Sequence, residues 1–267
     1  MTLDIRTSAE RIVSRLPASW TRYWRKRSAQ RSPSLLLAHR FRRSPVVALL
    51  SACIALALLI VVVDPWMHDL VRPIDPRLKQ TFLHWAWIGK ANWMLTTTGV
   101  ACLSLLVAGL ASKRAHTRVE RLHLATILGF VFWAIAAPGI VAATLKQAIG
   151  RTRPFLSDGL DTWNLHPWSG FDHASMPSGD VCNAAALAVA LSLLFPRYRL
   201  AFAAFAVLIA TGRLVSERHY LSDVLVGAAL GATGAYLVAV WLAGRGHVFR
   251  VTTAGALQLR GREIFRT

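Results

Sequence analysis

The chain has 267 residues, of which 54% are hydrophobic and only 16% are charged, and its formal net charge is +18. A soluble domain usually carries about a quarter charged residues, so this composition excludes an ordinary soluble enzyme. The apolar residues gather in runs close to the length of about 20 residues that crosses a bilayer. The sequence therefore predicts an integral membrane protein.

Residues 1–44 form a basic segment before the first apolar run, with 11 Lys and Arg residues against two acids, Asp4 and Glu10. Such a segment can attract nucleic acid or anionic lipid. Because it runs directly into a hydrophobic stretch, we expect it to bind anionic lipid headgroups on the cytoplasmic side or in the interface, and we expect no nucleic-acid partner. The run from 45 to 63 is too long for a signal-peptide core and predicts a permanent anchor.

The apolar runs predict an all-α fold, a six-transmembrane-helix bundle in one domain over residues 45–243, followed by a basic cytoplasmic tail at 244–267. The fourth and fifth runs are short for spans and need polar flanks buried among other helices. The expected spans are 45–63, 93–111, 122–145, 181–195, 200–216 and 222–243.

Basic residues in the short connections predict that both termini are cytoplasmic, N-in and C-in. With the N-terminus inside, the inner segments hold 22 of the 31 Lys and Arg residues. Six tryptophans then lie at the outer face, where a belt of interfacial rings explains them. The stretch 79–90 is typical of a short interfacial helix, with a lid or lipid gate as the alternative. The six tryptophans at the outer face are Trp66, Trp85, Trp87, Trp93, Trp163 and Trp168.

Three cysteines, Cys53, Cys102 and Cys182, fall within apolar runs and are interpreted as small buried hydrophobes. No spacing of Cys, His or carboxylates suggests a metal site, and we expect neither metal nor cofactor. A GxxxG pattern at 227–231 in the last span is interpreted as close packing within the bundle, with dimerisation as the alternative. The sequence leaves the oligomeric state open.

Polar residues form three clusters that the predicted topology brings to the outer face. Ionisable residues at membrane depth are costly and tend to mark function. Each cluster alone has a structural explanation, such as a snorkelling cation or a helix cap, but three on one face indicate a site. The clusters contain Lys146 and Arg153; Ser178, Gly179 and Asp180; and Arg213, His219 and Asp223.

These residue types suit phosphoryl chemistry. Lys146, Arg153 and Arg213 supply three cations for a phosphoryl group. A hydroxyl and backbone N–H groups at a helix N-terminus, where Ser178 and Gly179 stand, suit an anion. A histidine can attack phosphorus, and a carboxylate four residues later can accept from its other ring nitrogen.

The order and spacing of the clusters resemble the type 2 phosphatidic acid phosphatase superfamily over residues 90 to 243. The family signature has Lys, six residues and Arg-Pro, as at 146–154; Pro-Ser-Gly-His, here PSGD at 177–180; and Ser-Arg, five residues, His, three residues and Asp, here from Gly212 to Asp223. The resemblance implies that His219 is the nucleophile, with Asp223 as its partner. It further implies phosphate-binding roles for Lys146, Arg153, Ser178, Gly179 and Arg213.

Asp180 replaces the histidine that protonates the leaving group in the family, and three interpretations stay open. Asp180 can itself be the acid if its surroundings favour the protonated form. Alternatively the acid is elsewhere, at His173 or water, or a phosphate leaving group needs little protonation. The third interpretation is a non-catalytic lipid-phosphate binder or transporter.

We predict a bacterial inner-membrane lipid phosphatase whose active site faces the periplasm. The reaction expected is hydrolysis of a phosphomonoester or pyrophosphate on a membrane lipid of the undecaprenyl pyrophosphate, lipid A or phosphatidyl phosphate class, through a phosphohistidine. The alternative is a lipid phosphotransferase that uses the same intermediate.

Overall fold

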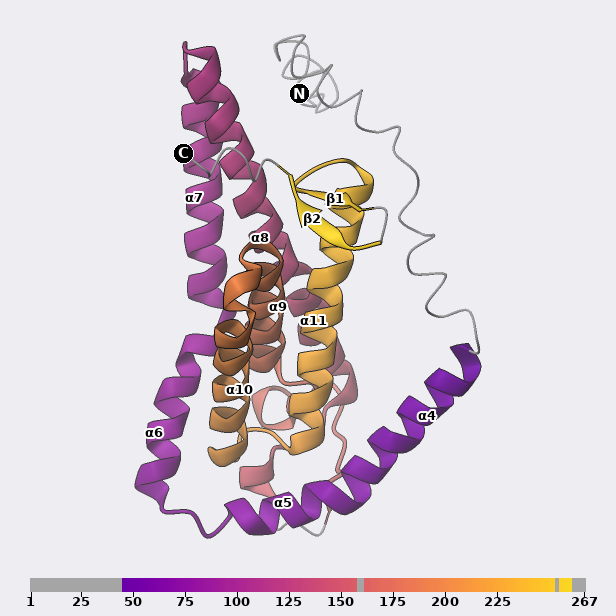
Figure 1. Cartoon of the computed structure of the whole chain (residues 1–267). Coiled ribbons are helices and arrows are strands. Elements are labelled where there is room, and N and C mark those ends of the chain that lie inside the picture. Colours follow the sequence, from indigo (N-terminus) through magenta and orange to yellow (C-terminus); the bar gives the residue numbers. More distant parts are fainter. Residues whose placement is uncertain (1–44, 158–160, 253–254, 261–267) are drawn as a thin grey trace, which may run out of the picture.

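The computed structural model describes residues 45–157, 161–252 and 255–260, so the basic segment 1–44 lies outside the described residues. The described chain is mostly helical, as predicted, with one short β-hairpin. The helices form a bundle from which α4 (Pro45–Leu58) extends away (Figure 1).

A π-helical turn, η1 (Leu59–Val63), joins α4 to α5 (Asp64–Val71). Pro65 explains this wider turn, because a proline ring clashes with the carbonyl four residues before it and has no N–H to donate. Directly after the turn, Asp64 is fully buried. An acid that the sequence places beside an apolar run therefore points into the protein.

From Pro76 to Gly244 the described chain consists of helices joined by 3₁₀ turns and loops. The 3₁₀ turn η2 (Trp87–Gly89) joins two of these helices, and further 3₁₀ turns are η3 (Pro154–Leu156), η4 (Phe171–His173) and η5 (Pro196–Tyr198). The helices are α6 (Pro76–Ala86), α7 (Ala91–Ala111), α8 (Ala115–Ile149), α9 (Gly179–Leu194), α10 (Arg199–Val215) and α11 (Leu221–Gly244).

Five helical segments of the described chain are long and apolar enough to cross a membrane. They are Val46–Val71, Pro76–Ala111, Ala115–Ile149, Pro196–Val215 and Leu221–Gly244. The fourth predicted span corresponds to α9, which has only 16 residues. Most of α9 is buried against α8, α10 and α11. This helix can be short because it is buried among other helices, as expected from the sequence.

Close helix packing at glycines sets the position of α9. A Cβ atom at Gly227 would lie 2.5 Å from the Ser178 carbonyl oxygen, and one at Gly231 would collide with the Cys182 carbonyl. The backbones of α11 and α9 approach closely because these residues have no side chain. The GxxxG pattern thus packs within the bundle, as expected, and it holds the N-terminus of α9 in place.

The helices place their connections at two opposite ends of the bundle (Figure 1). The α7–α8 and α9–α10 turns and the hairpin lie at one end. We call the other the site end; it comprises residues 64–75, 150–157, 161–178 and 216–220. The six tryptophans named above have exposed fractions between 38% and 70%.

The hairpin pairs β1 (Phe249–Val251) with β2 (Leu257–Leu259) in antiparallel register. Phe249 is fully buried and meets Phe130 of α8 edge to face, with 4.9 Å between ring centroids. The first part of the predicted C-terminal tail is therefore packed on the bundle.

Candidate active site

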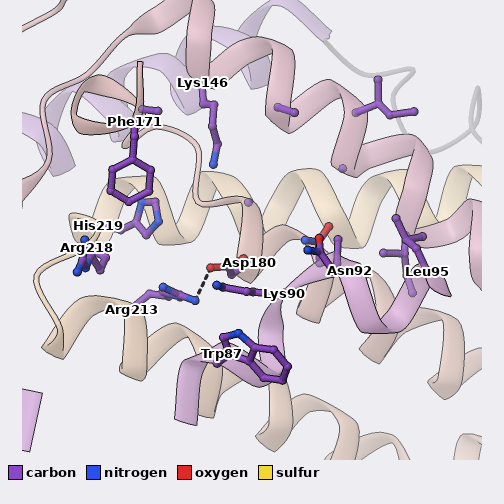
Figure 2. Close-up of a pocket in the computed structure, with 18 of the residues that line it drawn as sticks. Trp87, Lys90, Asn92, Leu95, Lys146, Phe171, Asp180, Arg213, Arg218 and His219 are labelled. Atoms are coloured by element: carbon purple, nitrogen blue, oxygen red, sulfur yellow. Dashed lines mark ion pairs between the residues drawn. The ribbon is translucent and has the colours of Figure 1, made fainter. Parts of the chain in front are cut away.

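A cavity of about 1370 Å³ is lined by residues of α6, α7, α8 and α9 and of the turn from α10 to α11. The structure brings all eight predicted site residues together at this cavity or beside it. Figure 2 shows four of them, Lys146, Asp180, Arg213 and His219. Ser178 and Asp223 are fully buried next to the cavity. The six others line it: Lys146, Arg153, Gly179, Asp180, Arg213 and His219.

His219 lies in the turn between α10 and α11 and is only 3% exposed. Its Nδ1 lies 2.7 Å from the Ser175 carbonyl oxygen. A carbonyl only accepts, so Nδ1 carries the proton and Nε2 is the free lone pair of the neutral ring. Burial, and then the cations Arg153, Lys146 and Arg213, lower the pKa of His219 well below its usual value. The ring is therefore neutral and nucleophilic at physiological pH.

From the sequence we expected Asp223 to accept a hydrogen bond from His219, but in the structure it does not. Its Oδ2 is 3.9 Å from His219 Nδ1, whose proton goes to the Ser175 carbonyl. Instead, Oδ2 accepts from the Ser175 hydroxyl at 2.6 Å and from the Tyr220 N–H at 2.9 Å. The physical reason is that Asp223 caps the start of α11, so it orients its neighbours and holds the ring through Ser175.

Arg151, which sequence reasoning missed, holds Asp223 from the other side. It is fully buried and donates from Nη1 to Asp223 Oδ1 at 2.6 Å and from Nη2 to Asp64 Oδ2 at 2.8 Å. Asp64 in turn accepts from the backbone N–H and the hydroxyl of Ser222. We call Asp64, Arg151 and Asp223 the buried triad. The signal in the sequence was Asp64, an acid beside an apolar run.

Arg153 is held rigidly at the cavity wall. Its guanidinium donates to the carbonyls of Phe171 at 2.8 Å, Arg218 at 3.1 Å and Ala174 at 3.3 Å, and it stacks on the Phe171 ring. Burial and the nearby cations Arg218 and Arg213 lower its pKa to about 10. Arg153 is still a cation at neutral pH, with its orientation set before any ligand binds.

The N-terminus of α9 meets Lys146 at the cavity. Ser178 is the N-cap residue, yet its hydroxyl caps nothing and is a buried oxygen without a hydrogen-bond partner among the described residues. A Cβ atom at Gly179 would lie 3.1 Å from Lys146 Nζ, so the glycine leaves room for the amine. A helix N-terminus with an unpaired hydroxyl and an adjacent ammonium group is well suited to an anion.

Asp180 lies in the first turn of α9, and its Oδ2 is 2.5 Å from Arg213 Nη2 (Figure 2). His173, the alternative proton donor, is not among the residues that line the cavity. Its Nδ1 is 2.9 Å from the Thr152 hydroxyl, and its ring packs on His166.

Gly212 stands where the family signature has serine. A Cβ atom there would lie 2.9 Å from Ala86 Cβ and 3.0 Å from the Phe82 carbonyl oxygen. The Ala86 carbonyl also accepts from Arg213 at 3.1 Å. The departure thus follows from the close packing of α6, which runs alongside α10 and supports Arg213 (Figure 1).

The cavity also contains features that the sequence did not reveal. Lys90 and Arg218 add two cations, and Lys90 points toward Asp180 (Figure 2). An apolar wall of α7 and α8 residues continues the cavity away from the cations: Leu95, Phe132, Trp133, Ile135 and Ile140. The described residues hold no group of three or more His, Cys, Asp or Glu side chains that could bind a metal ion.

In a comparison with known protein families, residues 127–246 match the model of the PAP2 superfamily. A lipid A 1-phosphatase of Rhizobium johnstonii is 34% identical over 171 residues, covering 64% of this chain and 68% of that protein. One of Rhizobium etli is 34% identical over 173 residues, covering 64% and 71%.

Two solved structures are similar at lower identity. LpxE of Aquifex aeolicus has a TM-score of 0.45 and 19% identity, covering 66% of this chain and 94% of that one. The PAP2-type phosphatidylglycerolphosphate phosphatase of Bacillus subtilis has a TM-score of 0.47 and 20% identity, covering 73% and 93%.

The fold and the cavity define a class, helical membrane proteins in which a neutral histidine faces a pocket lined with cations. Within that class the sequence relationships are specific. The chain belongs to the PAP2 superfamily, and these relationships indicate a phosphatase.

Proposed function

We propose that this protein hydrolyses a phosphomonoester or pyrophosphate on a membrane lipid through a phosphohistidine at His219. The observation that carries the proposal is the geometry of His219: Nδ1 is engaged by the Ser175 carbonyl, and the ring lines a cavity shared with Lys146, Arg153 and Arg213. The free Nε2 is a nucleophile held beside the groups that bind the phosphoryl oxygens.

In the first step Nε2 forms a bond to phosphorus as the bond from phosphorus to the leaving oxygen breaks. Lys146, Arg153 and Arg213 neutralise the charge on the phosphoryl oxygens, and the Ser178 hydroxyl and Gly179 N–H donate to them. The buried triad keeps Ser175, and through it the ring, in position. Water then attacks phosphorus, the P–N bond breaks, and free phosphate leaves.

The topology we infer has six spans with both termini in the cytoplasm, so that the site end faces the periplasm of a bacterial inner membrane. The alternating direction of the helices and the basic α7–α8 and α9–α10 turns support it. In this arrangement α9 is the fourth of the six spans, and it can be short because other helices surround it. Residues 1–44 then bind anionic headgroups at the cytoplasmic surface.

The substrate is a phosphate whose apolar tail fits the wall of α7 and α8 residues. The relatives named as lipid A 1-phosphatases support a lipid A-like phosphate among the classes considered. The test is to incubate the purified protein with lipid A, undecaprenyl pyrophosphate and phosphatidyl phosphates. Both free phosphate and phosphorylated lipid products are followed.

We expect free phosphate from at least one lipid, with inhibition by vanadate, which mimics pentacoordinate phosphorus. His219→Ala should reduce turnover to background. A newly phosphorylated lipid in place of free phosphate would instead identify a phosphotransferase, and lipid binding without turnover would identify a binder or transporter.

A further inference from the structure

The side chain of Asp180 is an ion-pair partner in the cavity. Its Oδ2 lies 2.5 Å from Arg213 Nη2, and the ammonium of Lys90 points toward it from another side (Figure 2). The Asp180 side chain is 24% exposed and the Arg213 side chain 8%, so this pair, unlike the buried triad, can be reached from the cavity. As the partner of a guanidinium the side chain is a carboxylate, which accepts hydrogen bonds and has no proton to donate.

No histidine replaces Asp180 as proton donor at the centre of the cavity. Of the described residues that line it, two are histidines, His219 and His84. His219 is the proposed nucleophile. His84 is an exposed residue of α6 whose Nδ1 lies 2.7 Å from the Gln80 carbonyl oxygen. The position that supplies the acid in the family signature holds a counter-ion here.

We propose that Asp180 is the counter-ion of Arg213 and that the site is consequently selective for lipid phosphates with a weakly basic leaving group. This inference rests on the proposed function and specifies its substrate class. Such leaving groups are the anomeric oxygen of a glycosyl phosphate and the phosphate of a lipid pyrophosphate. The alcohol oxygen of an alkyl phosphate is much more basic and needs a proton as it departs.

The chemical step balances without an acid. The Nε2–P bond forms, the leaving oxygen takes the electron pair of the breaking P–O bond, and it departs as an anion that later takes a proton from water. The bound phosphoryl group competes with Asp180 for Arg213, because both are anions and the guanidinium donors face the cavity.

The first experiment measures kcat/KM of the full-length protein in detergent micelles for phosphates with matched apolar tails. The series runs from alkyl phosphate through glycosyl 1-phosphate to aryl phosphate and pyrophosphate. General acid catalysis contributes about 10²–10⁴-fold, so the wild type should discriminate against the alkyl phosphate by at least about 10²-fold. Asp180→Asn and His84→Gln should discriminate against the alkyl phosphate as strongly as the wild type does. Asp180→His should discriminate less strongly.

Two results would overturn the proposal. One is a wild type that turns over alkyl and aryl phosphates at similar rates. The other is an Asp180→Asn protein that loses alkyl turnover selectively, because that pattern identifies Asp180 as the acid. A selective loss in His84→Gln would likewise locate an acid in the cavity and contradict the proposal.

A binding measurement tests the counter-ion without turnover. Asp180→Asn should bind inorganic phosphate and vanadate several-fold more tightly than wild type, since Arg213 is released. The matched control is Asp172→Asn, which removes an exposed acid at the same end that does not line the cavity, and it should leave both affinities unchanged. Equal affinities in all three proteins would refute the counter-ion, even if the proposed hydrolysis failed on every lipid.

Discussion

Two carboxylate–arginine contacts of similar length serve the site in different ways. Asp223 Oδ1 and Arg151 Nη1 are 2.6 Å apart with both side chains fully buried, and Arg151 also forms an ion pair with Asp64. Asp180 Oδ2 and Arg213 Nη2 are 2.5 Å apart at the wall of the cavity, where the carboxylate is partly exposed. No anion can reach the first pair without unfolding the protein, whereas a phosphoryl group can compete for the second. The first pair therefore maintains the site, and the second takes part in binding.

The largest effect should follow from breaking the buried triad with Arg151→Gln. Two carboxylates would then be left buried without their cation, which costs about 3–5 kcal/mol. Thermal unfolding in detergent should show a large fall in Tm. The control Arg199→Gln removes an exposed arginine at the opposite end of the bundle and should leave Tm unchanged. An unchanged Tm in Arg151→Gln would show that the triad does not stabilise the fold.

A smaller loss is expected from Ser175→Ala, which removes the hydroxyl that donates to Asp223 at 2.6 Å. A hydrogen bond to a charged group contributes about 1.5–3 kcal/mol. The Ser175 carbonyl, and with it the partner of His219, remains. We therefore expect a lower Tm and a modest fall in kcat at similar KM. A loss of turnover as complete as in His219→Ala, with Tm retained, would give the hydroxyl a direct catalytic part.

Gly212→Ser restores the residue of the family signature and should still destabilise this protein. Its Cβ atom would lie 2.9 Å from Ala86 Cβ, and overpacking of this kind costs about 1–3 kcal/mol. Because Ala86 also accepts from Arg213, phosphate affinity should fall together with Tm. A more stable or more active Gly212→Ser protein would contradict the packing of α6 on α10.

The smallest effect concerns the acid side of the stability profile. The pKa of His219 in the folded protein lies well below its usual value, whereas in the unfolded chain the pKa of the same side chain is about 6.5. The unfolded state binds the extra proton as pH falls, so this part of the stability is lost below about pH 6.5. Tm should fall more steeply with acid in wild type than in His219→Asn. Parallel curves would mean that His219 is not held neutral by burial.

The sequence predicted the parts of the site that depend on motif spacing and on which helix ends lie together. Lys146, Arg153 and His219 meet at one cavity because three helix ends lie at the same end of the bundle. The helical bundle was predicted for a simple reason: long apolar runs favour helices in which every backbone group is hydrogen-bonded.

Other features depend on contacts that no local pattern encodes. Asp64 and Arg151 are 87 positions apart, and Arg151 and Asp223 are 72 apart. The predicted His219–Asp223 hydrogen bond was wrong because the acceptor for Nδ1 is a backbone carbonyl, which residue types do not reveal. The packing of Gly212 against α6 could likewise be seen only in three dimensions.

The central claim is that His219 receives the phosphoryl group, and trapping that intermediate tests it most directly. Wild-type protein is mixed with a ³²P-labelled lipid phosphate, quenched in base, in which phosphohistidine is stable, and digested for mass spectrometry. We predict one labelled site, His219, that appears before free phosphate and is lost on acid treatment. Release of free phosphate with no label on His219, or a label on another residue, would contradict the account.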